Sequence, residues 1–362
     1  MADLSRTTLP SNTVVWLDLL RGMSAQAVLL GHLRLFDSAT TPLQHAAAPQ
    51  TIAVIVFYIL SGFLIFHTIA NKIHISSYNF TSFFIDRFCR IYPAYFASLV
   101  FVVIVDALYR SFYPADYLEH GYRYRVSTFI ANVFFLQKIN IHQGSFGTAT
   151  QLWSLPPEWW LYMLTGYVMF TLRIKKTITF KNILITALFG FAPVCFLFKG
   201  NPITGVGMSA IWLFGGIVYV MYKHLPVNTT EQNMFRMMTC FSLIFLGCAI
   251  QRYISSDYGY DILGAFNLSG AFLCTVWLTH SHRCDFLTHP YTIRASKFFA
   301  GYSFSLYLTH HSLVLLLAHS WPTMAIWIFC NLVAIGFAYI FERNHREIAA
   351  RMRTYFKIEV KA

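Results

Sequence analysis

Ten apolar segments, most of them long enough to cross a lipid bilayer, constrain this chain more than any other feature. They lie near residues 14–36, 51–71, 91–109, 152–172, 182–198, 204–222, 235–253, 262–280, 299–318 and 323–341. A helix needs about 20 apolar residues to span the hydrocarbon core. Only 12% of the residues are charged, which is too few to cover a soluble surface. The sequence therefore predicts an all-α, polytopic membrane protein, a helical bundle with about ten transmembrane helices.

A shorter apolar run at residues 127–137 is too brief to cross the membrane by itself. We expect it to be re-entrant or interfacial. No linker or second domain is evident, so we expect one membrane-embedded domain over residues 1–362. Its spans run from about residue 14 to 341, and a tail follows at residues 342–362.

The positions of Lys and Arg predict the orientation. If the N-terminus is cytoplasmic and the ten segments cross, 19 of the 27 Lys and Arg lie on the inner side. Because cytoplasmic loops are enriched in these residues, both termini are predicted inside. The net charge of +12 comes from such loops and from the tail, so no nucleic-acid partner is predicted. The seven cysteines include no C-x-x-C pair, and no metal site is predicted.

The first apolar segment contains Asp18, Arg21 and His32. At 100° per residue they share one helical face, and Arg21 and His32 are separated by about 16 Å along the axis. A charge near the bilayer centre costs at least about 2.5–3.5 kcal/mol, so such residues usually face a polar cavity. The alternative is a structural Asp18–Arg21 ion pair with a hydrogen-bonded histidine.

Two further segments carry polar groups on the predicted inner side or in mid-span. Arg87 and Arg90 lie one helical turn apart and suit a phosphate-rich ligand, although they could instead anchor the chain to anionic lipid headgroups. Ser61 and Gly62 lie in the middle of their segment, where close helix packing is the alternative to a role in the site.

Polar groups also occur in the segments nearer the C-terminus. Glu158 is expected close to the outer edge of its span, where it could also be an interfacial carboxylate among aromatic residues. Tyr307 and His310 lie within another span, and we give them more weight than the neighbouring Ser and Thr residues, which often bond their own backbone.

Six short motifs in this order resemble those of the acyltransferase 3 family of integral-membrane acyltransferases. They comprise Leu17-Asp18, Leu20-Arg21-Gly22 and Gly31-His32; Phe57 to Leu64; Arg87, Arg90, Ile91 and Pro93; Trp153, Ser154, Leu155 and Glu158; Ser305 to Leu308 with His310; and Glu342-Arg343. The chain departs from the family pattern at Leu19, at Pro156-Pro157, at Thr309 and at Asn344.

This resemblance implies the transfer of an acetyl or other short acyl group, usually from acetyl-CoA, to a hydroxyl of an envelope glycan such as lipopolysaccharide O-antigen. It also implies a location in the bacterial inner membrane, with acyl-CoA bound on the cytoplasmic side and no metal ion. The remaining partners would be the lipid bilayer and the glycan or glycolipid acceptor.

The residues then suggest roles in this chemistry. Arg87 and Arg90 would bind the phosphates of CoA, and Arg21 would hold its pantetheine end, a phosphate or the thioester carbonyl. His32 would act as a general base or as a transient acyl carrier. Asp18 would support Arg21 by pairing with it.

The remaining candidates surround this core. Glu158 would bind or orient the acceptor hydroxyl, while Ser61, Tyr307 and His310 would help to bind the donor. The competing hypothesis is a proton-coupled transporter or flippase of a polar envelope precursor that uses Asp18, Arg21 and His32. The two halves show no convincing inverted repeat, which favours the acyltransferase.

Overall fold

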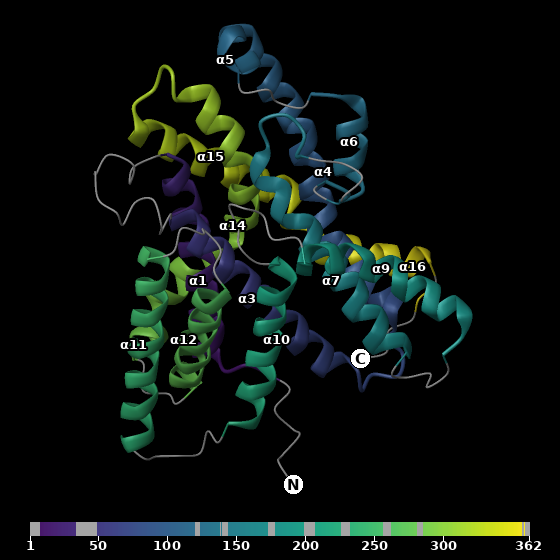
Figure 1. The fold of residues 1–362 in the computed structure, drawn as a ribbon, viewed down its shortest axis with the longest axis vertical. Helices are drawn as coiled ribbons and strands as arrows, with labels where there is room; N and C mark the ends of the chain where they lie inside the picture. The colour runs from purple at the N-terminus through teal and green to yellow at the C-terminus, as the bar shows by residue number, and fades with distance from the viewer. Residues whose placement is uncertain are drawn as a thin grey trace. The chain divides into compact units, whose positions relative to one another are not determined.

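The computed structural model describes residues 8–33, 49–119, 124–137, 139, 144–172, 178–198, 207–225, 232–255, 262–280, 285–356 and 358. All of their long elements are helices, as Figure 1 shows, so the prediction of an all-α membrane protein is confirmed. The helices belong to two compact units. One comprises Met1–His74 with Leu197–Ala300, and the other comprises Ile75–Phe196 with Gly301–Ala362. The expectation of one domain over residues 1–362 stays a prediction.

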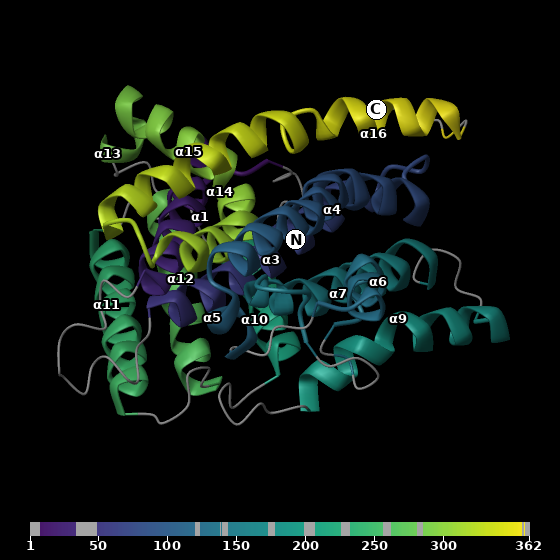
Figure 2. The same cartoon turned by 90° about the horizontal axis from the view of Figure 1, so that it is seen from above.

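The first unit is built around α3, which packs against α1, α10 and α12. The helix α11 lies along α12 in both views (Figures 1 and 2). The helices of this unit are α1 (Ser11–His32), α3 (Pro49–Lys72), α10 (Met208–His224), α11 (Gln232–Ser255), α12 (Ile262–His280), α13 (Asp285–Thr288) and the start of α14 (Pro290–Leu317).

Glycines allow α3 and α10 to approach closely. A Cβ atom at Gly62 would overlap the carbonyl oxygen of Trp212, and one at Gly215 would overlap that of Ile59. Such small residues are typical of helix contacts within membranes, because they let the backbones touch. The Ser61-Gly62 pair therefore lies at a helix-packing contact.

The second unit is organised by the long helix α4, which packs against α6, α7, α15 and α16. Its elements are α4 (Phe80–Phe112), α5 (Pro114–Glu119), α6 (Val126–Val133), the 3₁₀ helix η1 (Thr150–Ser154), α7 (Leu155–Tyr167), the π-helical turn η2 (Val168–Leu172), α9 (Phe180–Phe198), the rest of α14, α15 (Thr323–Phe341) and α16 (His345–Tyr355). The tail after the last span thus contains a helix that runs beside α4 (Figure 2).

The helix α4 begins eleven residues before the predicted span 91–109. Its N-terminus is capped by Asn79, whose side chain accepts a hydrogen bond from the backbone N–H of Ser82 at 3.0 Å. The polar residues Arg87 and Arg90 lower the local hydropathy, so the apolar pattern starts only after them. Both arginines lie inside this continuous helix, one turn apart as expected.

The helix α7 accommodates one departure from the family pattern. Pro156 and Pro157 lie in its first turn. Proline is favoured at the start of a helix because the first N–H groups have no partner within the helix and the fixed φ angle is already helical. The two prolines therefore initiate α7, and Glu158 follows them in the same turn.

Each of the ten predicted segments contains helix in its described part, and among the described residues seven candidate spans are long and apolar enough to cross a membrane. The predicted segments 152–172, 204–222 and 299–318 lie outside those seven. Two of them contain short helices, the 13-residue α7 and the 17-residue α10. The segment 127–137 contains α6, whose eight residues are too few to cross. The count of ten crossings stays a prediction.

Candidate functional site

The residues predicted to form the site are divided between the two units. Asp18, Arg21, His32 and Ser61 belong to the first unit, whereas Arg87, Arg90, Glu158, Tyr307 and His310 belong to the second. Each unit brings some of its residues together.

One face of α1 carries the polar residues of the first unit. Asp18, Arg21 and His32 are half-buried, and between them Ala25 and Val28 are buried. On the opposite face of the same helix Met23 is 64% exposed. The polar residues are therefore on a face covered by protein, as a cavity inside a bundle requires.

A hydrogen bond of His32 determines which of its two ring nitrogens carries the proton. Its Nδ1 lies 2.8 Å from the carbonyl oxygen of Val28, one turn earlier in α1. A carbonyl oxygen can only accept, so Nδ1 carries the proton. In the neutral ring Nε2 then holds the lone pair, which is the form needed to accept a proton from a hydroxyl.

Ser61 is held at the contact between α3 and α10. Its Oγ accepts a hydrogen bond from the indole Nε1 of Trp212 at 3.1 Å, and the serine is 8% exposed. This geometry gives Ser61 a packing role in the first unit. Its assignment to donor binding stays a prediction.

Arg90 joins three of the sequence motifs in the second unit. Its Nη2 lies 3.1 Å from Oε1 of Glu342, which directly follows α15 and is only 2% exposed. The other carboxylate oxygen of Glu342 accepts a hydrogen bond from Ser305 of α14 at 2.9 Å. Removing Arg90 would leave the buried carboxylate of Glu342 uncompensated, and the contacts of Glu342 connect α4, α14 and the end of α15.

Arg87 differs from Arg90 because it forms no ion pair among the described residues. Its guanidinium lies 5.8 Å from the ring centroid of Phe83, one turn earlier in the same helix. Its Nε is buried, and no acceptor for it exists within the described part of the chain. Buried donors are normally satisfied, so this atom marks a place where an external acceptor fits.

Glu158 lies in the first turn of α7, which packs against α4. Its neighbour Trp159 packs against Phe84 and Phe88, with ring centroids 6.1 Å and 6.5 Å apart. Glu158 therefore lies beside the arginine-bearing start of α4, which extends well before the predicted span and is covered by α7. Its expected place near the outer edge of the membrane stays a prediction. Glu158 accepts a hydrogen bond from the hydroxyl of Tyr162.

Tyr307 connects two further motifs. Its hydroxyl lies 2.5 Å from Oγ of Ser154 and donates to the carbonyl oxygen of Gln151 at 2.6 Å. Gln151 in turn donates to the carbonyl oxygen of Leu308 at 3.0 Å. The fully buried His310 donates from Nδ1 to the carbonyl oxygen of Leu306 at 2.9 Å. These contacts fix η1 against α14, and the donor-binding roles of Tyr307 and His310 stay predictions.

Asp106 is a buried residue that our sequence analysis did not select. It is 1% exposed, accepts the backbone N–H of Thr148 at 3.0 Å and accepts the hydroxyl of the same residue. A Cβ atom at Gly147, which has a φ of +54°, would overlap this carboxylate. The sequence offered a signal for this residue, because an acidic side chain inside the predicted span 91–109 usually has polar partners within the protein. Asp106 positions the loop that leads into η1 and α7.

The described ranges contain no group of three or more His, Cys, Asp or Glu able to hold a metal ion. The first unit supplies an imidazole and a guanidinium, and the second supplies two guanidinium groups and a carboxylate. These are the groups used in acid–base chemistry on a charged substrate.

Known proteins support one family. Residues 14–343 match the family described as an acyltransferase domain. An O-acetyl transferase of Shigella phage Sf6 is 29% identical over 164 residues, which are 44% of this chain and 47% of the phage protein. The match thus spans about half the length of that relative. No solved structure matches the chain. Because the family match covers nearly the whole sequence and includes the motifs placed above, this protein belongs to the acyltransferase 3 family.

Proposed function

We propose that this protein transfers an acetyl group from acetyl-CoA to a hydroxyl of an envelope glycan, such as lipopolysaccharide O-antigen. The observation that carries the proposal is the hydrogen bond from Nδ1 of His32 to Val28, which makes Nε2 the nitrogen that can take up a proton in the neutral ring. The phage relative is named an O-acetyl transferase, which supports the acetyl group and the hydroxyl acceptor.

In the proposed reaction, Nε2 of His32 takes the proton of the acceptor hydroxyl while the hydroxyl oxygen attacks the thioester carbonyl. The carbon–sulfur bond breaks, the acetyl group is now esterified to the glycan, and the proton passes to the leaving CoA thiolate. Arg21, on the same face of α1, stabilises the negative charge on the carbonyl oxygen. Asp18 pairs with Arg21 and keeps it oriented.

Arg87 and Arg90 bind the phosphate groups of CoA, because guanidinium groups make bidentate contacts with phosphate. The buried Nε of Arg87 supports this assignment, since a phosphate oxygen would satisfy it. Glu158 orients the acceptor hydroxyl. Its location beside the start of α4 means that the acceptor has to reach the depth of the two arginines.

The cellular setting follows from the charge distribution. We infer that the protein lies in the bacterial inner membrane, with both termini and the acyl-CoA site on the cytoplasmic side. The excess of Lys and Arg in alternate loops supports this orientation.

The activity is tested with purified protein, radiolabelled acetyl-CoA and a lipid-linked glycan fraction from bacterial membranes. We expect label in the glycan with wild-type protein, retained after all cysteines are changed to serine and lost in His32→Ala. Flux of a glycan precursor across proteoliposomes without acetyl transfer would overturn the proposal in favour of a transporter. An NMR comparison of glycans with and without the gene then identifies the acetylated hydroxyl.

A further inference from the structure

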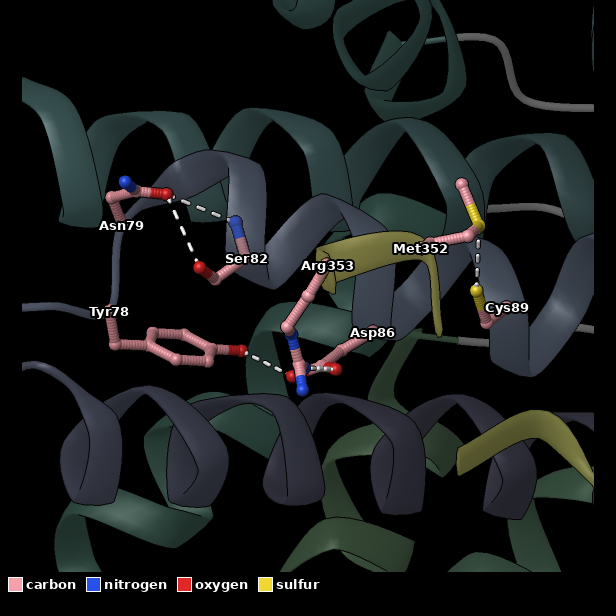
Figure 3. Close-up of polar contacts among 7 residues, drawn as sticks. All are labelled: Tyr78, Asn79, Ser82, Asp86, Cys89, Met352 and Arg353. Carbon is pink, nitrogen blue, oxygen red and sulfur yellow. Dashed lines mark hydrogen bonds and ion pairs between the residues drawn. The ribbon is translucent and has the colours of Figure 1, made fainter. Parts of the chain in front are cut away.

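Two contacts hold α16 along the first half of α4. Arg353 pairs with Asp86, which also accepts a hydrogen bond from the hydroxyl of Tyr78 at 2.8 Å (Figure 3). Beside them, Sδ of Met352 lies 3.3 Å from Sγ of Cys89. Burial, together with the charge of Asp86, raises the pKa of Tyr78, so its hydroxyl keeps the proton that it donates. The C-terminal helix is therefore fixed beside the arginine-bearing stretch.

The start of α16 is fixed at the same stretch by Glu342. While its carboxylate pairs with Arg90 at 3.1 Å, its carbonyl oxygen accepts a hydrogen bond from Nδ1 of His345 at 2.8 Å. Burial, together with the charges of Arg90, Arg346 and Arg87, lowers the pKa of His345, so its ring favours the neutral form. Three guanidinium groups and one imidazole, from two separate helices, thus belong to the same stretch.

This cluster, made of Arg87, Arg90, His345 and Arg346, has too few negative partners. Glu342 pairs with Arg90, but Arg87 and Arg346 form no ion pair among the described residues. No side chain caps the first turn of α16, and Glu347 in that turn offsets part of the positive end of its helix dipole. Like charges at short range repel, and a bound polyanion relieves that repulsion. The buried Nε of Arg87, which lacks an acceptor, independently points to the same kind of ligand.

We propose that His345 and Arg346, at the start of α16, complete the binding site for the phosphate groups of the acyl donor together with Arg87 and Arg90. The inference rests on the proposed function, since it takes acyl-CoA as the donor. The C-terminal segment is then a part of the donor site, and its attachment to Asp86 positions it there.

The test compares Arg346→Gln with a matched control, Arg351→Gln, which removes the same charge from another exposed position of α16. Binding of CoA and of pantetheine, which lacks phosphate groups, is measured by calorimetry on detergent-purified full-length protein. We expect Arg346→Gln to weaken CoA binding about tenfold, the loss of one charge-assisted hydrogen bond, and to leave pantetheine binding unchanged. Arg351→Gln should bind both ligands as wild type does.

Several outcomes separate this inference from the proposed function. Equal CoA affinity for Arg346→Gln and Arg351→Gln, or an equal loss of CoA and pantetheine binding, would overturn the inference. Failure of wild-type protein to bind CoA would do the same. If Arg346→Gln weakens CoA binding as expected but wild-type protein transfers no acetyl group, the phosphate site stands and the proposed reaction fails. Unchanged melting temperatures of both variants confirm that the comparison reports binding.

Discussion

At the scale of single residues, His32 is half-buried on a protein-covered face of α1, and its Nδ1 is held by a hydrogen bond to the carbonyl oxygen of Val28. We predict that His32→Gln lowers acetyl transfer by at least about a hundredfold, because the amide can donate to Val28 but cannot take up a proton. The melting temperature should stay close to that of wild type. Acetyl transfer at the wild-type rate in this variant would show that another group is the base.

The same residue distinguishes a base from an acyl carrier. If His32 acts as a base, mass spectrometry of protein quenched during turnover should detect no acetylated peptide around residue 32. A labelled peptide that forms and decays at the rate of product formation would instead establish a covalent intermediate.

The Arg90–Glu342 pair makes a second prediction at this scale. Glu342→Ala should lower the free energy of unfolding by roughly 2–3 kcal/mol. This loss is smaller than for a fully buried ion pair, because the side chain of Arg90 is 29% exposed. The double variant Arg90→Met with Glu342→Leu should recover most of the stability and none of the donor affinity. Thermal unfolding in detergent and CoA binding measure the two effects separately.

Sequence reasoning at this scale found the charged residues but not their partners. Arg90 was selected because two arginines one turn apart suit phosphate, whereas Glu342 was seen only as part of a motif. The two lie far apart in the chain, and nothing local in the sequence predicts that they pair. Ser61 shows the reverse case, since its hydrogen bond to Trp212 supports the packing alternative.

At the scale of helices, the contact between α3 and α10 depends on glycine. Gly62→Ala should lower the melting temperature clearly, because the new methyl group would meet the backbone of Trp212. The control is Gly247→Ala in α11, where nothing lies within 4 Å of the added atom. An equal effect of the two substitutions would mean that helix propensity, and not helix contact, is what Gly62 contributes.

Helix positions were predicted well because apolar length is a strong local signal, and the errors occurred where charge interrupts it. The predicted span 91–109 therefore misses the first eleven residues of α4. The helical character of the tail was also missed, since α16 alternates charged and apolar residues and is stabilised by its contact with α4.

At the scale of the whole molecule, the charge distribution predicts one orientation in the membrane. A fluorescent protein fused after Ala362 should fluoresce, because that fold matures in the cytoplasm. An alkaline phosphatase inserted at α5 (Pro114–Glu119) should be active, because the charge distribution predicts this segment on the opposite side of the membrane. The opposite pattern would reverse the orientation and place Arg87 and Arg90 away from cytoplasmic CoA.

The pairing of Arg90 with Glu342 also has a consequence for biosynthesis. Glu342 follows Arg90 by about 250 residues, so at roughly 5–20 residues per second the ribosome supplies this carboxylate some tens of seconds after the arginine. During that interval the start of α4 carries the charge of Arg90 without the carboxylate of Glu342. Translation that stops before Glu342 therefore yields a nascent chain in which Arg90 lacks this carboxylate.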